Sequence, residues 1–366
     1  MVTAALELEL RREKSLRRWV RRVFWTFVAL LVLAAACGAA YQTISEGLDR
    51  KRFPQVGHAV DVGGFSLNLN CIGKGNPTVI LESGLGIPAI GWQLVQPEVA
   101  KFATVCSYDR AGYGWSDPGP FPRTSREIAR ELHTLLENAR VPPPYILVGH
   151  SFGGFNVRLF NHLYPTEVAG VVFVDASQED QELKMRRSIR ETNAKDLRQL
   201  QRMNSVMGFL INLGIARAGM TRSLDTQNLP RDLRDELIYL QLQRKFVDAM
   251  VAEESSFDES ADQVRGAGTL GNKPVIVLTA GAFVDIPGVP KEDSDEFFAS
   301  WVGELQPRLA HLSSRGRQVV LLNSHHLIPF EQPQAVVNAV KEVVEESKNN
   351  PQRPSASRSK RELKKR

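Results

Sequence analysis

A serine flanked by glycines, in the sequence GHSFG at 149–153, is the residue best suited to nucleophilic chemistry. The apolar run 145–148 leads into it, and apolar residues at helical spacing follow until Pro165. This pattern predicts a strand, a sharp turn carrying Ser151 and then a helix. The glycines let strand and helix approach closely, and the N-terminus of the helix favours an anion that develops there. We expect Ser151 to be a nucleophile, although a purely structural Gly-Ser turn would use the same residues.

A histidine is the usual base for such a serine, because a serine hydroxyl is by itself a weak nucleophile. Four histidines follow Ser151 in the chain, namely His162, His311, His325 and His326. The first two fall within predicted helices, where a surface or packing role is more common. The last two directly follow the final predicted strand, 318–322, so they are expected at the carboxyl edge of the sheet together with Ser151.

Eight strands are predicted around these residues, at 58–61, 65–70, 78–81, 103–108, 145–148, 168–174, 274–279 and 318–322. The first two form a hairpin around two glycines, and most of the others are separated by predicted helices, at 88–101, 125–138, 294–313 and 333–346. Such alternation predicts an α/β fold with a mostly parallel sheet flanked by helices. Between 178 and 268 the alternation stops and several charged helices are predicted, which indicates a helical cap inserted after the sixth strand.

Four motifs make the pattern specific: ESGLG at 82–86, DRAGYG at 109–114, GHSFGG at 149–154, and SHH at 324–326 followed by EQP at 331–333. With them, residues 57–346 resemble the α/β-hydrolase superfamily, in its serine-hydrolase branch that carries a helical cap. The resemblance implies a hydrolase core at 57–177 and 269–346 with a cap at 178–268. Relatives that open epoxides or remove halides use aspartate as the nucleophile, and the serine at 151 argues against both activities.

The resemblance also implies the partners of the serine. In this family the catalytic histidine stands five residues before the EQP motif, which implies His326 as general base, with His325 as the weaker alternative. The acid follows either the sixth or the seventh strand in different members. Asp175 fits the first position and is favoured, and Asp285 fits the second and stays open.

Backbone N–H groups of Leu85 and Phe152 are implied as the oxyanion hole. Asp109 and Arg110 are expected to hold their loop together by an ion pair rather than to take part in the chemistry. No metal or organic cofactor is expected, because no Cys/His cluster has the spacing of a ligand set and the glycine-rich pieces lack the spacing of a phosphate loop.

Residues 23–41 are uncharged and mostly apolar, which is just long enough to cross a bilayer as a helix. The leader 1–22 carries seven Arg or Lys against three Glu. This asymmetry predicts an uncleaved signal anchor with a cytoplasmic N-terminus and an extracytoplasmic catalytic domain. The alternatives are a signal peptide cleaved near 34–36, a lipidated Cys37 and a buried core helix.

The chain has a net charge of +5, but its positive charge is concentrated at the two ends. The tail 347–366 holds eight Arg or Lys against one Glu and is expected to be disordered. The body between the ends is mildly acidic, so no nucleic-acid partner is expected.

Two further expectations depend on the resemblance. The family's strand order makes the second and fourth strands neighbours, which implies a disulfide between Cys71 and Cys106 and agrees with an oxidising compartment; two buried thiols are the alternative. The implied function is cleavage of a small-molecule or lipid ester through an acyl-enzyme on Ser151. There are two alternatives: a peptidase of the proline-iminopeptidase type, or a non-catalytic envelope protein that has the same fold and serves as a binding module.

Overall fold

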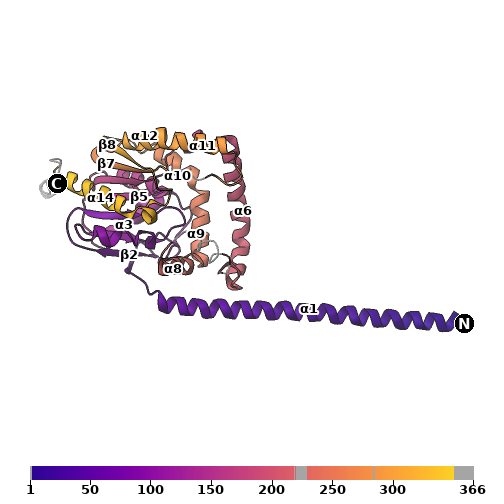
Figure 1. The fold of residues 1–366 in the computed structure, drawn as a ribbon. Helices are drawn as coiled ribbons and strands as arrows, with labels where there is room; N and C mark the ends of the chain where they lie inside the picture. Colours follow the sequence, from indigo (N-terminus) through magenta and orange to yellow (C-terminus); the bar gives the residue numbers. More distant parts are fainter. Residues whose placement is uncertain (1, 218, 220–228, 283–284, 350–366) are drawn as a thin grey trace, which may run out of the picture. The chain divides into compact units, whose positions relative to one another are not determined.

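The computed structural model (Figure 1) describes residues 2–217, 219, 229–282 and 285–349, so most of the expected basic tail lies outside the described residues. The chain divides into two compact units. One comprises 1–54 and 205–228, and the other comprises 55–204 and 229–366.

The larger unit is organised around one eight-stranded sheet in the order β1-β2-β4-β3-β5-β6-β7-β8. The strands are β1 (His58–Asp61), β2 (Ser66–Ile72), β3 (Thr78–Glu82), β4 (Val105–Tyr108), β5 (Tyr145–His150), β6 (Val168–Val174), β7 (Gly271–Ala280) and β8 (Ser313–Leu321). The β1–β2 and β2–β4 pairs are antiparallel and every other pair is parallel. The expected fold is therefore confirmed. The β2–β4 register places Cys71 opposite Cys106, and the two form the expected disulfide.

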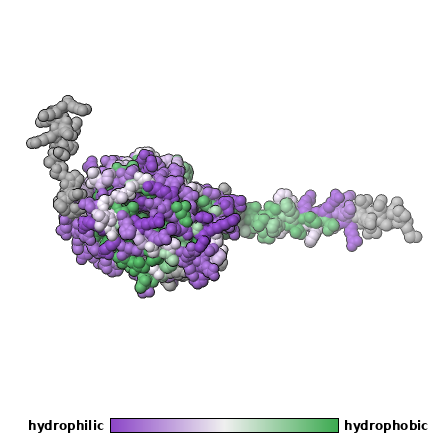
Figure 2. Space-filling model, turned by 90° about the horizontal axis from the view of Figure 1, so that it is seen from above, coloured by the Kyte–Doolittle hydropathy of each residue, from purple (hydrophilic) through white to green (hydrophobic). Residues whose placement is uncertain are grey.

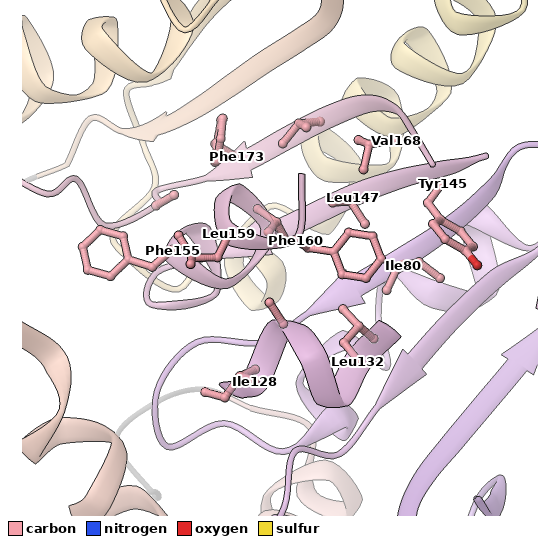
Figure 3. Close-up of a cluster of buried hydrophobic side chains, with 14 of the residues drawn as sticks. Ile80, Ile128, Leu132, Tyr145, Leu147, Phe155, Leu159, Phe160, Val168 and Phe173 are labelled. Atoms are coloured by element: carbon pink, nitrogen blue, oxygen red, sulfur yellow. The ribbon is translucent and has the colours of Figure 1, made fainter. Parts of the chain in front are cut away.

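Helices cover both faces of this sheet. Consecutive side chains of a strand point to opposite faces, so Ile80 belongs to one apolar cluster while Val79 and Leu81 belong to the other. Helices α3 (Ser125–Asn138) and α4 (Gly153–Leu163) pack on the first face, and Figure 3 shows Phe160 of α4 beside Ile80 and Tyr145 of the sheet. Helices α2 (Gln96–Val99) and α14 (Pro333–Lys348) pack on the second face.

Between β6 and β7, all regular structure in the described residues is helical, as expected for the cap segment. Its described helices are α5 (Gln181–Lys184), α6 (Arg187–Asn212), α8 (Arg231–Gln241), α9 (Arg244–Ser255) and α10 (Phe257–Arg265). The last of them packs against α3 and α4, and its Ala261 and Val264 are part of the first apolar cluster. Helix α10 therefore extends the helical layer of the sheet.

Two helices expected from the sequence are interrupted in the structure. Instead of one helix over 88–101, a 3-10 turn η1 (Ala89–Trp92) precedes α2. Instead of one helix over 294–313, helix α11 (Lys291–Ser300) passes through a π turn η2 (Trp301–Leu305) into α12 (Gln306–Ala310). Pro307 has no N–H to donate, so a regular α-helical hydrogen-bond ladder cannot continue through it. The π turn carries Trp301, which is part of the site described below.

The smaller unit contains helix α1 (Val2–Arg52), which includes the whole apolar run 23–41. Figure 2 shows this run as an apolar band along the helix next to a polar stretch. The helix is long and apolar enough to cross a membrane, and the apolar window is not covered by protein. These properties are compatible with a membrane anchor.

Candidate active site

Ser151 lies in a tight turn between β5 and α4, and its backbone has φ of +51°. Non-glycine residues rarely adopt this conformation, and where they do the surrounding structure must hold them there. The two flanking glycines are required by space. A Cβ on Gly149 would lie 2.7 Å from the carbonyl oxygen of Gly153, and a Cβ on Gly153 would lie 2.7 Å from that of Glu82. The local sequence therefore builds the sharp turn that the pattern predicted.

His326 connects Ser151 to Asp175. Its Nε2 lies 2.9 Å from Ser151 Oγ, and its Nδ1 lies 2.6 Å from Asp175 Oδ2. An ionised carboxylate can only accept a hydrogen bond, so Nδ1 carries the proton and Nε2 is left to accept one from the serine hydroxyl. This tautomer is the one in which an imidazole can act as a base toward serine.

Asp175 directly follows β6, is buried, and has φ of +42°. Its Oδ1 accepts hydrogen bonds from the indole Nε1 of Trp301 at 2.9 Å and from the backbone N–H of Ala280 at 3.0 Å. Burial raises the pKa of Asp175, but the hydrogen bonds and charge of His326, together with the two donors to Oδ1, outweigh it and hold the pKa below its usual value. The carboxylate therefore stays ionised beside the histidine.

The alternative acid, Asp285, is not brought to this place. Its side chain is 66% exposed and its nearest cation is Lys291, at 3.6 Å. Two of the histidines that follow Ser151 in the chain also lie away from it. His162 contacts the carbonyl of Ala267, and His311 is exposed at the end of α12. Of the two candidate acids, the structure places only Asp175 in contact with His326.

The loop that carries His326 is held by Glu331 of the EQP motif. Glu331 Oε2 accepts hydrogen bonds from the backbone N–H of His325 at 2.6 Å and from Ser324 Oγ at 3.1 Å. His325 Nδ1 lies 3.3 Å from Glu331 Oε1, so the His325 side chain contacts the motif instead of Ser151. The fixed spacing between the histidine and EQP thus has a structural cause, since the glutamate fastens the loop.

His150 fastens the same loop from the other side. Its Nε2 lies 2.9 Å from the backbone carbonyl of His326, which can only accept, so Nε2 carries a proton. Burial, followed by the proximity of His326, lowers the pKa of His150 to about 3. His150 is therefore neutral in the folded protein. Its place within the GHSFG motif did not indicate this role.

The backbone N–H groups of Leu85 and Phe152 make no hydrogen bond within the described part of the chain. Both residues line the same cavity as Ser151. The loop that carries Leu85 packs closely against the turn that carries Ser151, because a Cβ on Gly84 would lie 2.8 Å from His150 Nδ1 and 3.1 Å from Ser151 Cβ. Two free donors beside a serine can bind a developing oxyanion.

Arg110 does not form the expected ion pair with Asp109. It bonds instead to Glu82 at 2.8 Å and to both carboxylate oxygens of Glu253, at 2.8 and 2.9 Å. Adjacent residues at the end of a strand point in opposite directions, so these two neighbours cannot readily pair. Asp109 accepts hydrogen bonds from the N–H of Ala89 and from Asn68.

Arg110 also holds the loop that carries Leu85. Its Nη1 donates to the carbonyl of Ser83 at 2.7 Å, and its Nη2 donates to that of Gly84 at 2.9 Å. Glu253 accepts a further hydrogen bond from Tyr113 Oη, which accepts one from the N–H of Gly86. The loop 83–86 is therefore held from both ends by buried side chains, one of which comes from helix α9.

A cavity of about 390 Å³ opens onto Ser151 and His326. Its apolar lining includes Phe152, Phe257, Phe297 and Trp301. Glu254 also lines it, and no cationic side chain among the described residues pairs with this carboxylate. Within the same described residues, no group of three or more His, Cys, Asp or Glu is arranged to hold a metal ion.

Comparison with known proteins agrees with this architecture. A family model described as alpha/beta hydrolase family matches residues 79–339. The probable transporter efuK of Hormonema carpetanum is 28% identical over 317 residues, which cover 78% of this chain and 42% of that protein. The matched parts cover half or less of the first curated relatives.

Solved structures show the same fold. The epoxide hydrolase CorEH matches with a TM-score of 0.60 at 17% identity, covering 78% of this chain and 97% of that one. A thermophilic esterase from Thermogutta terrifontis matches with a TM-score of 0.56 at 21% identity, covering 79% and 98%. At these identities the likeness concerns the fold. Because the family model spans well over half of the sequence, this chain belongs to the alpha/beta hydrolase family.

Proposed function

We propose that this protein is a serine hydrolase that cleaves carboxylic esters through an acyl-enzyme on Ser151. The observation that carries the proposal is the hydrogen-bonded series Ser151–His326–Asp175 with the serine in a strained turn. His326 Nε2 takes the hydroxyl proton while Oγ attacks the ester carbonyl. The resulting oxyanion accepts hydrogen bonds from the N–H groups of Leu85 and Phe152.

The second half of the reaction uses the same groups. His326 returns its proton to the leaving alkoxide, and the acyl group remains on Ser151. Water then gives a proton to His326 and attacks the acyl carbonyl. The bond between the acyl carbon and Oγ breaks, Oγ takes the proton back from His326, and the acid is released. Throughout, Asp175 stabilises the positive charge that forms on His326, and the donors Trp301 and Ala280 keep Asp175 ionised and oriented.

The lining of the cavity favours a substrate with an apolar acyl group. Aromatic side chains make up much of its lining, and burying apolar substrate surface against them contributes roughly 25 cal/mol per Å². We therefore propose small-molecule or lipid esters with apolar acyl groups as the substrates.

Glu254 favours a second candidate, a peptidase of the proline-iminopeptidase type. A carboxylate that pairs with no cationic side chain of the described residues, in a largely apolar cavity, could bind the protonated amino end of a peptide. The same serine chemistry would then cleave an amide. A panel that compares aryl esters with aminoacyl amides separates the two candidates, because Glu254→Gln should weaken only the cleavage of a cationic substrate.

We further propose that helix α1 anchors the protein in a membrane, with the basic leader in the cytoplasm and the hydrolase domain outside it. The Arg-rich stretch before the apolar run 23–41 supports this orientation. The Cys71–Cys106 disulfide agrees with it, since disulfides persist mainly outside the reducing cytosol.

The proposed activity is tested by labelling the full-length protein in detergent with a fluorophosphonate, which phosphonylates an activated serine and releases fluoride. We expect wild-type protein to take up the label and Ser151→Ala and His326→Ala to take up none. Asp285→Asn serves as the matched control and should label like wild type. Folded wild-type protein that takes up no label would overturn the hydrolase and favour the non-catalytic binding protein.

A further inference from the structure

In the smaller unit, helix α1 packs against a part of the cap segment. A Cβ on Gly38 would lie 2.5 Å from the carbonyl oxygen of Leu213, and a Cβ on Gly214 would lie 2.7 Å from the ring of Tyr41. The two backbones therefore approach more closely than residues with side chains would allow. Ile211, beside this contact, is 6% exposed.

A buried polar contact continues this packing toward the end of the helix. Arg217 donates to Asp49 Oδ2 at 2.6 Å and to Gln42 Oε1 at 3.2 Å, and both Arg217 and Gln42 are buried. Gly38, Gln42 and Asp49 recur at helical spacing and so share one face of α1. The cap segment thus lies along this face from the end of the apolar run onward.

Both partners also expose apolar side chains. Tyr41, Ile44 and Leu48 recur at helical spacing on α1 and are more than half exposed. On the cap segment, Val206 is 50%, Phe209 62% and Ile215 54% exposed. We call the five aliphatic and phenyl residues of this set the docking face: Ile44, Leu48, Val206, Phe209 and Ile215.

The position of the apolar run sets the depth of this face. Gly38 lies within the run and Tyr41 ends it, so the residues that touch them lie at the boundary of the hydrocarbon if the run spans a bilayer. From Tyr41 the helix rises roughly 5 Å to Ile44 and roughly 10 Å to Leu48, while the headgroup layer is about 5–8 Å thick on each side of a bilayer. The docking face therefore begins within the interfacial layer at Ile44 and reaches its outer edge near Leu48.

We propose that the docking face binds the surface of the same bilayer that α1 spans, so that the cap segment is itself attached to the membrane. This inference rests on the anchor proposed above. The occupant is lipid because the face is continuous with an apolar helix window in which no residue is buried by protein. Apolar side chains beside a membrane-spanning helix are stabilised by burial at the boundary between headgroups and acyl chains.

The test uses the full-length protein in lipid nanodiscs with Cys37→Ala, which removes the exposed cysteine and leaves the disulfide pair. An environment-sensitive fluorophore is attached at Phe209→Cys and, in a second protein, at Ile215→Cys. Leu322→Cys, at a residue of the core that is 75% exposed, is the matched control. We expect nitroxide lipids labelled near the headgroup to quench most of the fluorescence at 209 and 215 and little at 322.

Failure of the docking and failure of the anchor give different results. Protein that stays in the membrane after alkaline carbonate, but whose labels at 209 and 215 are no more quenched than the label at 322, would overturn the docking alone. If the fluorophores at 209 and 215 are not quenched by the nitroxide lipids, but their emission is blue-shifted and the protein cross-links as a dimer, the face binds a second copy of the chain. This result would also overturn the docking to lipid. Release by carbonate would overturn the anchor and the docking together. Fluorophosphonate labelling of the same samples reports separately on the hydrolase.

Discussion

Arg110 and Glu253 form a fully buried bidentate ion pair, although 143 positions separate them in the chain. The arginine belongs to the segment after β4, and the glutamate belongs to helix α9 of the cap segment. The same guanidinium donates to the carbonyls of Ser83 and Gly84, immediately before the N–H of Leu85. The pair therefore connects a cap helix with the loop that is proposed to bind the oxyanion.

Replacing Glu253 should impair both stability and catalysis. In Glu253→Gln the guanidinium remains buried without one of its carboxylates, and breaking a buried pair in this way costs about 3–5 kcal/mol of unfolding free energy. The loop 83–86 loses one of its supports, so kcat for an ester should fall more than KM changes. Denaturant unfolding and steady-state kinetics measure the two effects. Glu254→Gln, at the next position, is the control and should leave ester hydrolysis nearly unchanged; an equal loss in both variants would contradict this role.

The two candidate acids predict opposite results. Asp175→Asn should lower kcat roughly 10⁴-fold, because an amide no longer selects the histidine tautomer that can accept the serine proton. Asp285→Asn should change little, since this carboxylate is exposed and forms a surface ion pair with Lys291. Ester hydrolysis by the two purified variants decides the matter. Comparable activity in both would remove Asp175 from the proposed mechanism.

His150 makes stability depend on pH. Its pKa is about 3 in the folded protein and about 6.5 for an unperturbed histidine. Between these values the unfolded chain binds a proton that the folded chain does not, so this residue lowers the unfolding free energy as the pH falls from about 6.5 toward 3. In His150→Gln, which keeps an N–H donor, this part of the loss should disappear. Denaturant unfolding of both proteins between about pH 3 and 6.5 measures how the unfolding free energy changes with pH. If it changes equally in both proteins, His150 does not cause the pH dependence.

Much of the site could be predicted because its parts leave local signatures. Ser151 is marked by glycines that the turn requires, and His326 is marked by its distance from the EQP glutamate that fastens its loop. Asp175 and Asp285 could not be separated, since each follows a strand at the same edge of the sheet. Their surroundings differ only in the folded chain, where Asp175 receives three hydrogen bonds and Asp285 is exposed.

The residues that sequence reasoning missed act across long distances in the chain. Nothing near Glu253 indicates that it pairs with Arg110, because helix α9 carries no motif and only the folded chain brings the two together. Trp301 was hidden in a segment predicted as one regular helix. A π turn that contains Trp301 interrupts the regular α-helical hydrogen bonds, and Pro307 follows it. This proline was the feature of the sequence that could have indicated the interruption.

Trp301 offers the last test of the arrangement. Trp301→Phe keeps an aromatic ring in the cavity but removes the N–H that donates to Asp175 Oδ1. A hydrogen bond to a charged group contributes about 1.5–3 kcal/mol, so kcat should fall roughly 10- to 100-fold if the whole contribution is expressed in the transition state. KM should change less, because the ring still contacts the acyl group. Trp92→Phe is the control, since the buried indole N–H of Trp92 has no hydrogen-bond partner among the described residues. If both variants lose kcat equally, the loss reflects packing in the core, and the indole N–H of Trp301 has no separate effect on Asp175.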